Sequence, residues 1–153
     1  MSSWAARRGP ATSPPNAEFN TYVDPNAAAE VFTGGAHITM IGLDVTRQEM
    51  ITPERLAAIA AAGIVVADAV AKMLGAYPAG APLHDPCVIA YLLQPDLFAG
   101  RAARVTVQTA HGGTLGRTLV DWNVPPDACN ATVMETVDSD GLFALLTECL
   151  GQL

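Results

Sequence analysis

Two short segments combine residue types that could contact a metal ion or a sugar. The first, Leu83-His84-Asp85-Pro86, joins an imidazole to a carboxylate where proline predicts the start of a helix. A carboxylate in this place suits a hard cation or the hydroxyls of a polyol, and His84 could donate or accept a proton. Asp-Pro is also an ordinary helix start. On spacing alone we therefore interpret Asp85 as a helix cap and His84 as a loop residue.

The second segment is Asn16-Ala17-Glu18-Phe19-Asn20. In an extended chain alternate residues share a face, so Glu18 and Asn20 would point to the same side. A carboxylate accepts hydrogen bonds from sugar hydroxyls, and an amide both donates and accepts them. A polar loop before a helix is the structural alternative, and we prefer it when this segment is taken alone. Neither segment is decisive by itself.

Composition and charge exclude several classes of protein. The chain has 153 residues, of which 15 are acidic and 8 basic, and the net charge of −7 argues against nucleic acid as a partner. Three cysteines without C-x-x-C spacing argue against a disulfide framework or a structural zinc site and predict three buried free thiols. The longest apolar stretch, residues 59–70, is too short to cross a bilayer. No secretory signal is evident, so we expect a cytoplasmic protein that does not bind membranes.

The positions of proline and glycine predict where helices begin and end. A capping residue precedes proline at Asp24-Pro25, Thr52-Pro53 and Asp85-Pro86, which predicts three helix starts. The helix from Pro53 should end or bend at Gly63 before a second helix to about residue 74. The helix from residue 85 should reach about residue 93, and a last amphipathic helix should follow a cap at residue 138.

Apolar runs and alternating patterns predict the strands. Residues 37–43 and 130–137 are strand candidates, and the alternation at 105–107 and 118–122 around Gly112-Gly113 predicts a hairpin. These elements predict an α/β layered domain in which helices flank a mixed sheet with a hairpin near its C-terminal edge. About four strands are fewer than the five or six of a typical covered sheet, which suggests an incomplete domain. Residues 1–15 are rich in proline and predict a flexible lead-in to a domain at 16–153.

Five blocks, in this order along residues 16–153, resemble the nucleoside hydrolase family. They are Ala17-Glu18-Phe19-Asn20, Tyr22-Val23-Asp24-Pro25, Ile38-Thr39-Met40-Ile41-Gly42-Leu43-Asp44-Val45-Thr46, Pro82-Leu83-His84-Asp85-Pro86-Cys87 and Val137-Asp138-Ser139-Asp140-Gly141-Leu142-Phe143. The chain is therefore identified as similar to the C-terminal half of an inosine/uridine-preferring nucleoside hydrolase.

The resemblance implies chemistry and roles for particular residues. The family consists of calcium-dependent N-ribohydrolases, glycosidases that cleave the bond between ribose and a purine or pyrimidine base in nucleoside salvage. By this resemblance Asp85 would bind calcium and a ribose hydroxyl, and Glu18 and Asn20 would bind other ribose hydroxyls. His84 would donate a proton to the leaving base. The implied partners are a ribonucleoside substrate and either a second copy of the chain or a separate N-terminal half.

The resemblance also has gaps. The family's N-terminal motif D-x-D-P-G-x-D-D, which supplies most calcium ligands, has no match here, and Ala11-Thr12 stands where the family usually has Gly-Asn. Calcium takes about six to eight oxygen ligands, and only Asp85 is assigned to it. We therefore expect a truncated or split hydrolase that is inactive alone. The alternatives are a non-catalytic module that binds ribosides or docks onto subunits, and a decayed product without a stable fold.

Overall fold

The computed structural model describes residues 16–78 and 80–152, and its chain forms two units. The first unit comprises 16–40 and 101–133, and the second comprises 41–100 and 134–152. The prediction of a flexible lead-in at 1–15 lies outside the described residues. Within the described part of the chain, no helix is both long and apolar enough to cross a membrane.

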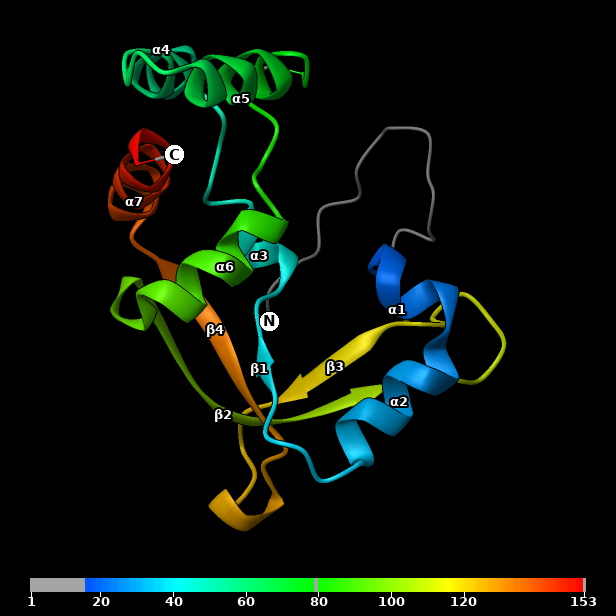
Figure 1. The fold of residues 1–153 in the computed structure, drawn as a ribbon. Coiled ribbons are helices and arrows are strands. Elements are labelled where there is room, and N and C mark those ends of the chain that lie inside the picture. The colour runs from blue at the N-terminus through cyan, green and yellow to red at the C-terminus, as the bar shows by residue number, and fades with distance from the viewer. Residues whose placement is uncertain (1–15, 79, 153) are drawn as a thin grey trace. The chain divides into compact units, whose positions relative to one another are not determined.

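The first unit contains two helices and the paired parts of a mixed sheet (Figure 1). The strand order is β1-β4-β2-β3, with β1 parallel to β4 and β2 antiparallel to β3. Its small core consists of Ala103, Val105, Ala131 and Val133. The predicted α/β class, the mixed sheet and the hairpin are confirmed. The elements of this unit and the strands that enter it are α1 (Phe19–Val23), α2 (Pro25–Thr33), β1 (Thr39–Met40), β2 (Phe98–Val107), β3 (Thr118–Asp121), the 3-10 turn η2 (Pro126–Ala128) and β4 (Ala131–Val137).

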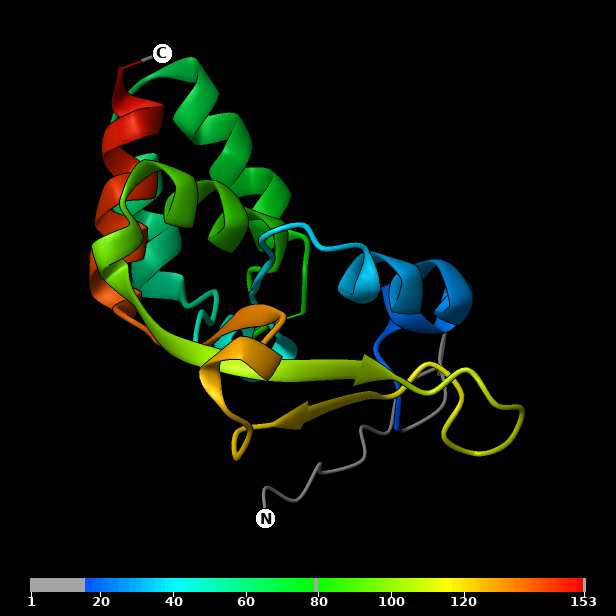
Figure 2. The same ribbon diagram turned by 90° about the horizontal axis from the view of Figure 1, so that it is seen from below.

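The second unit is a group of helices around the last helix of the chain. Helices α4, α5 and α6 each contact α7, and Figure 2 shows the four gathered together. Leu142 and Phe143 of α7 pack with Ile59 of α4 in the main core, where burying each side chain contributes about 1.5–3 kcal/mol. The elements are α3 (Leu43–Thr46), α4 (Pro53–Ala60), α5 (Val65–Gly75), α6 (Asp85–Leu93), the 3-10 turn η1 (Pro95–Leu97) and α7 (Ser139–Gly151).

Two of the three predicted caps before proline are present. The Asp24 carboxylate accepts a hydrogen bond from the Ala27 N–H at 2.9 Å, and the Thr52 hydroxyl accepts one from the Arg55 N–H at 3.3 Å. The third prediction, that Asp85 is a cap, is wrong. The backbone of His84 has already turned, with φ −102° and ψ −75°, so His84 takes the cap position and Asp85 is the first helical residue.

Other departures follow from contacts that local patterns do not encode. The predicted strand at 37–43 is reduced to Thr39–Met40, because Leu43 already begins α3. Strand β2 begins at Phe98, seven residues before the alternation that predicted it. Of the three thiols predicted to be buried, only Cys87 is; Cys129 and Cys149 are partly exposed.

Candidate functional site

Glu18 and Asn20 lie together at the start of α1 in the first unit. Glu18 is the cap residue, and its carboxylate accepts a hydrogen bond from the backbone N–H of Asn20 at 2.8 Å. The prediction that the two side chains share the face of an extended segment is wrong, because residues 19–23 are helical. Asn20 is exposed, and Glu18 is partly exposed. The capping hydrogen bond therefore joins Glu18 to Asn20, and strand alternation does not.

The loop between β2 and β3 holds this helix start. The Thr21 hydroxyl donates to the Gly116 carbonyl at 2.7 Å, and the Asn16 amide donates to the Gly113 carbonyl at 3.3 Å. Gly116 has φ +77°, and a Cβ there would lie 2.7 Å from the Tyr22 Cα. Only glycine fits that backbone and that approach. Local sequence patterns predicted only a turn in this loop and gave no sign of its contact with α1.

His84 and Asp85 lie at the start of α6 in the second unit, and both are exposed. The Nδ1 atom of His84 is 2.9 Å from the hydroxyl of Thr46. Within 16–78 and 80–152, no residue forms a hydrogen bond or ion pair with the Asp85 carboxylate. Because no cap uses this carboxylate, it remains available to a ligand. The two predicted pairs thus belong to different units.

A buried polar network of Glu49, Ser139 and Arg55 contacts the residue before His84. The carbonyl of Glu49 accepts a hydrogen bond from the Leu83 N–H at 2.8 Å, next to His84. The side chain of Glu49 is completely buried, and its Oε2 accepts from the Ser139 hydroxyl at 3.2 Å. Its Oε1 has no partner among the described residues. Burial raises the pKa of Glu49, and the Ser139 hydrogen bond and the charge of Arg55 oppose that rise.

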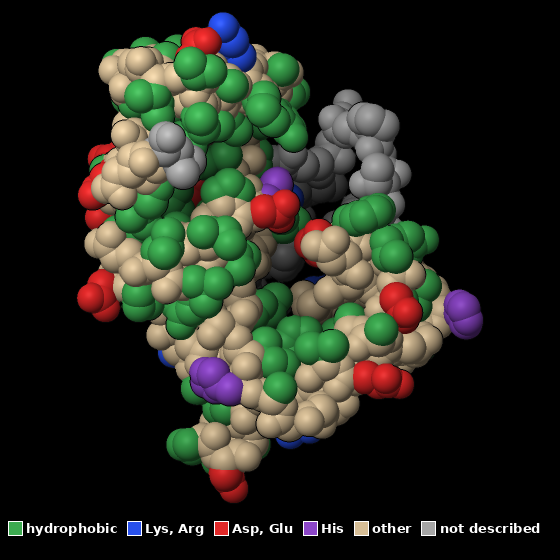
Figure 3. Space-filling model, in the orientation of Figure 1, with side chains coloured by type: hydrophobic (Ala, Val, Ile, Leu, Met, Phe, Trp, Pro, Cys, Tyr) green, Lys and Arg blue, Asp and Glu red, His purple; other side chains and the backbone are tan. Residues whose placement is uncertain are grey.

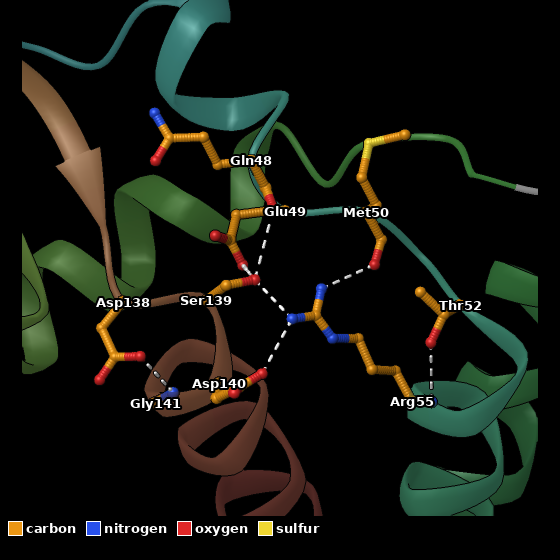
Figure 4. Close-up of polar contacts among 9 residues, drawn as sticks. All are labelled: Gln48, Glu49, Met50, Thr52, Arg55, Asp138, Ser139, Asp140 and Gly141. Atoms are coloured by element: carbon orange, nitrogen blue, oxygen red, sulfur yellow. Dashed lines mark hydrogen bonds and ion pairs between the residues drawn. The ribbon is translucent and has the colours of Figure 1, made fainter.

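Arg55 of α4 connects this network to α7 (Figure 4). Its guanidinium donates to the Met50 carbonyl at 2.8 Å, to the Ser139 hydroxyl, and to the Asp140 carboxylate at 3.1 Å. It also lies 4.1 Å from the centre of the Phe143 ring, a distance typical of a cation–π contact. One side chain therefore joins the 48–50 segment to the first turn of α7. Thr46, Glu49 and Arg55 were not predicted from the sequence, because each has a partner that is distant in the sequence.

Cys87, in the first turn of α6, does not have the properties of a nucleophile. Its side chain is fully buried, and its Sγ lies 3.4 Å from the Leu83 carbonyl. Burial, and to a smaller extent the nearby charge of Glu49, raise its pKa to about 11. A thiol with so high a pKa is almost entirely protonated at neutral pH, and the thiolate is the reactive form.

The described residues do not form a calcium site. In the part of the chain that the structure covers, no three or more His, Cys, Asp or Glu side chains are close enough to hold a metal ion. Asp85 is an exposed carboxylate, whereas calcium takes about six to eight oxygen ligands. Asp85 can therefore supply one ligand to such an ion, but the second unit does not enclose it.

An apolar groove of about 350 Å³ runs between α6 and α7, with Asp85 among its lining residues. The neighbouring surface of α6 is also apolar: Leu92 and Leu93 are 71% and 61% exposed. Figure 3 shows hydrophobic side chains at the surface over α6. The remaining lining residues of the groove are Pro86, Ile89, Ala90, Leu93, Leu142, Leu145, Leu146 and Cys149.

Known proteins resemble this chain in sequence and in structure. The family model described as inosine-uridine preferring nucleoside hydrolase matches residues 3–144. The pyrimidine-specific ribonucleoside hydrolase RihA of Shewanella woodyi is 42% identical over 147 residues, which cover 89% of this chain and 47% of that protein. The chain therefore spans about half the length of the curated relatives it matches.

Solved structures agree with the sequence comparison. A plant nucleoside hydrolase is 30% identical, with a TM-score of 0.74 over 91% of this chain and 49% of its own. The purine-preferring ribonucleoside hydrolase of Gardnerella vaginalis is 26% identical, with a TM-score of 0.72 over 89% and 46% of the two chains. These matches confirm the predicted family and fold. The chain belongs to the inosine-uridine preferring nucleoside hydrolase family.

Proposed function

We propose that this chain supplies groups for the hydrolysis of the N-glycosidic bond of purine or pyrimidine ribonucleosides, and that it is inactive alone. In this proposal Glu18, Asn20 and Asp85 bind ribose hydroxyls, and His84 protonates the departing base. The observation that carries it is the start of α6, where the exposed carboxylate of Asp85 is free of any capping bond beside an exposed imidazole. Its support from the family is the match over residues 3–144.

The proposed reaction is the replacement of the base by water at the anomeric carbon of the ribose. Water adds to the anomeric carbon, the bond between that carbon and the base nitrogen breaks, and the base leaves with a proton from His84. The water loses a proton to solvent, and solvent returns a proton to His84. Positive charge develops on the ribosyl ring in the transition state, and nearby carboxylates stabilise it. Protonation of the base makes it a better leaving group.

Calcium binding would require more ligands than Asp85 alone. The family resemblance implies this ion, but Asp85 is the one ligand that we assign to it, and the described residues form no metal cluster. We therefore expect the purified chain to bind calcium weakly or not at all. Additional carboxylates would have to come from outside the described residues.

We further propose that the chain works in a cytoplasmic assembly, either with a second copy of itself or with a polypeptide that carries the Asp-rich motif. The chain matches 47% of the length of RihA from Shewanella woodyi, and the second partner would supply residues of the part that it does not match. The exposed apolar side chains of α6 support association of either kind, because apolar surface patches often mark interaction sites.

Reconstitution tests this function. The purified chain should release no base from inosine or uridine, with or without calcium. Co-expression with the N-terminal segment of a relative that carries D-x-D-P-G-x-D-D should restore calcium-dependent release. Asp85→Ala should abolish the restored activity, and Asp24→Ala, which removes an acidic residue from another helix start, should retain it.

Two results would contradict the proposal. Calcium-stimulated hydrolysis by the chain alone would show that it is a complete catalyst. Full activity of the reconstituted Asp85→Ala variant would show that this carboxylate has no role in the reaction.

A further inference from the structure

Thr46 contacts His84 from the end of α3, and both residues belong to the second unit. Thr46 is 5% exposed, and its Oγ1 lies 2.9 Å from the Nδ1 of His84. The backbone N–H of Thr46 donates to the Gly42 carbonyl at 3.1 Å. The hydroxyl therefore belongs to a hydrogen-bonded helical turn. Thr46 lies 38 residues before His84 in the sequence.

The hydroxyl hydrogen determines the direction of this hydrogen bond. A buried hydroxyl must donate its hydrogen to an acceptor or bear the cost of desolvation. In the described part of the chain, His84 Nδ1 is the partner that the geometry gives to Thr46 Oγ1. If the hydroxyl donates, Nδ1 must present its lone pair, and the neutral imidazole then carries its hydrogen on Nε2.

A second contact fixes the same two segments to each other. The Leu83 N–H donates to the Glu49 carbonyl at 2.8 Å, and the Cys87 N–H donates to the His84 carbonyl at 3.2 Å. Glu49 in turn is fully buried and bonded to Ser139. Segment 46–49 thus holds residues 83–84 through one backbone bond and one side-chain bond, and the imidazole cannot rotate without breaking the latter.

We propose that Thr46 is a positioning residue that orients the His84 imidazole and places its hydrogen on Nε2. This inference rests on the proposed role of His84 as proton donor to the base. The Nε2–H tautomer offers a hydrogen at the nitrogen remote from Thr46, whereas the opposite tautomer would offer a lone pair there. Thr46 does not touch the substrate in this scheme and acts only through His84.

Nitrogen NMR of the ¹⁵N-labelled full chain tests the inference without any activity. At about pH 8.5, two units above the ordinary imidazole pKa, the two nitrogen shifts of a neutral histidine locate its hydrogen. We expect His84 to carry its hydrogen on Nε2, with Nδ1 shifted as a hydrogen-bond acceptor. His37 and His111 are exposed and provide references in the same spectrum.

Three variants separate the bond from general stability. In Thr46→Val the His84 shifts should move to those of His37 and His111, and in Thr46→Ser they should stay at the wild-type values. Thr147→Val removes a comparable hydroxyl bond, to the Phe143 carbonyl in α7, and should leave His84 unchanged. A hydrogen on Nδ1 in the wild-type chain would overturn the proposal even if Thr46→Val failed to fold. Identical shifts in wild type and Thr46→Val would also overturn it.

Kinetics of the reconstituted assembly then connect the tautomer to catalysis. Thr46→Val should lower kcat about tenfold or more with little change in KM, because proton donation and not ribose binding is affected, and Thr46→Ser should recover most of the rate. Unchanged kcat would overturn the catalytic part of the inference. Absence of base release by the wild-type assembly, with the expected NMR result, would instead refute the proposed function and leave the positioning of His84 by Thr46 intact.

Discussion

The same dipeptide, Asp-Pro, opens both α2 and α6, but the two helix starts are built differently. At α2 the Asp24 carboxylate caps the helix by accepting from the Ala27 N–H, and no residue of that helix is buried. At α6 Asp85 is the first helical residue and makes no such bond, and Cys87 and Ala90 of that helix are buried. One start is stabilised by its own side chain, and the other by its surroundings.

The difference shows why Asp85 is available to a ligand. Residues 46–49 position the chain before α6 through the Thr46–His84 contact and the bond from the Leu83 N–H to the Glu49 carbonyl. That external support replaces the capping bond, so the carboxylate of Asp85 is not consumed by local structure.

The largest expected effect comes from replacing Arg55, which bonds to Met50 and to Ser139, the partner of Glu49. Replacing Arg55 by Met removes the hydrogen bonds to Met50 and Ser139 and the cation–π contact with Phe143. The free energy of unfolding should fall by about 2–3 kcal/mol, because two acceptors in the network lose a charged donor. Chemical denaturation measures this loss.

Two further variants show what Arg55 contributes. Arg55→Lys keeps the charge but cannot form the same fork, so it should recover less than half of the loss. Asp140→Ala should have little effect, because the Asp140 side chain is 98% exposed and such ion pairs are weak. If Arg55→Met were as stable as the wild type, the network would not support the start of α6.

The next effect separates the two helix starts directly. Asp24→Ala should lower the free energy of unfolding by about 1 kcal/mol, the usual cost of losing an N-cap bond. Asp85→Ala should cost distinctly less, because it removes only the interaction of a charge with the helix dipole. Both substitutions delete an acidic residue near a helix N-terminus, so the difference between them reports the capping bond. Equal losses in thermal or urea unfolding would show that Asp85 caps α6 in solution.

Local patterns predicted those features that local contacts determine. The caps at Asp24, Thr52 and Asp138 each bond to a backbone N–H three residues later, so a short window of sequence contains both partners. The hairpin follows from alternation on either side of a glycine turn, and its strands pair as expected. The family resemblance added the fold and the identity of the candidate residues, which spacing alone had assigned to a cap and a loop.

The features that were missed depend on contacts between distant segments. Asp85 precedes proline as Asp24 does, but Thr46 and Glu49 contact the two residues before it, and both are more than 30 residues away in the sequence. The helical turn after Glu18 depends on a bond from Thr21 to Gly116, 95 residues away. Glu49 follows Gln48 in a polar segment that suggests exposure to solvent, but its side chain is completely buried.

The smallest expected effect is a change in the pH dependence of stability at Glu49. Burial raises the pKa of this carboxyl above its ordinary value of 4.5, so the folded chain holds its proton more tightly than the unfolded chain does. The stabilising contribution is therefore fully present below about pH 4.5 and is lost as the pH rises through the raised pKa. Glu49→Gln cannot titrate, so its free energy of unfolding should fall less than that of the wild type between about pH 5 and 7.

Glu54 provides the matched control because its shift has the opposite sign. It is an exposed glutamate in the first turn of α4, and hydrogen bonds from its own backbone N–H and from the Thr52 side chain lower its pKa. Its contribution is present above about pH 4.5 and disappears as the pH falls through the lowered value. Glu54→Gln should therefore leave the profile between about pH 5 and 7 parallel to the wild type. If the Glu49→Gln profile were also parallel to that of the wild type, Glu49 would titrate as an ordinary exposed carboxyl. The segment that holds the start of α6 would then be open to water, as the start of α2 is.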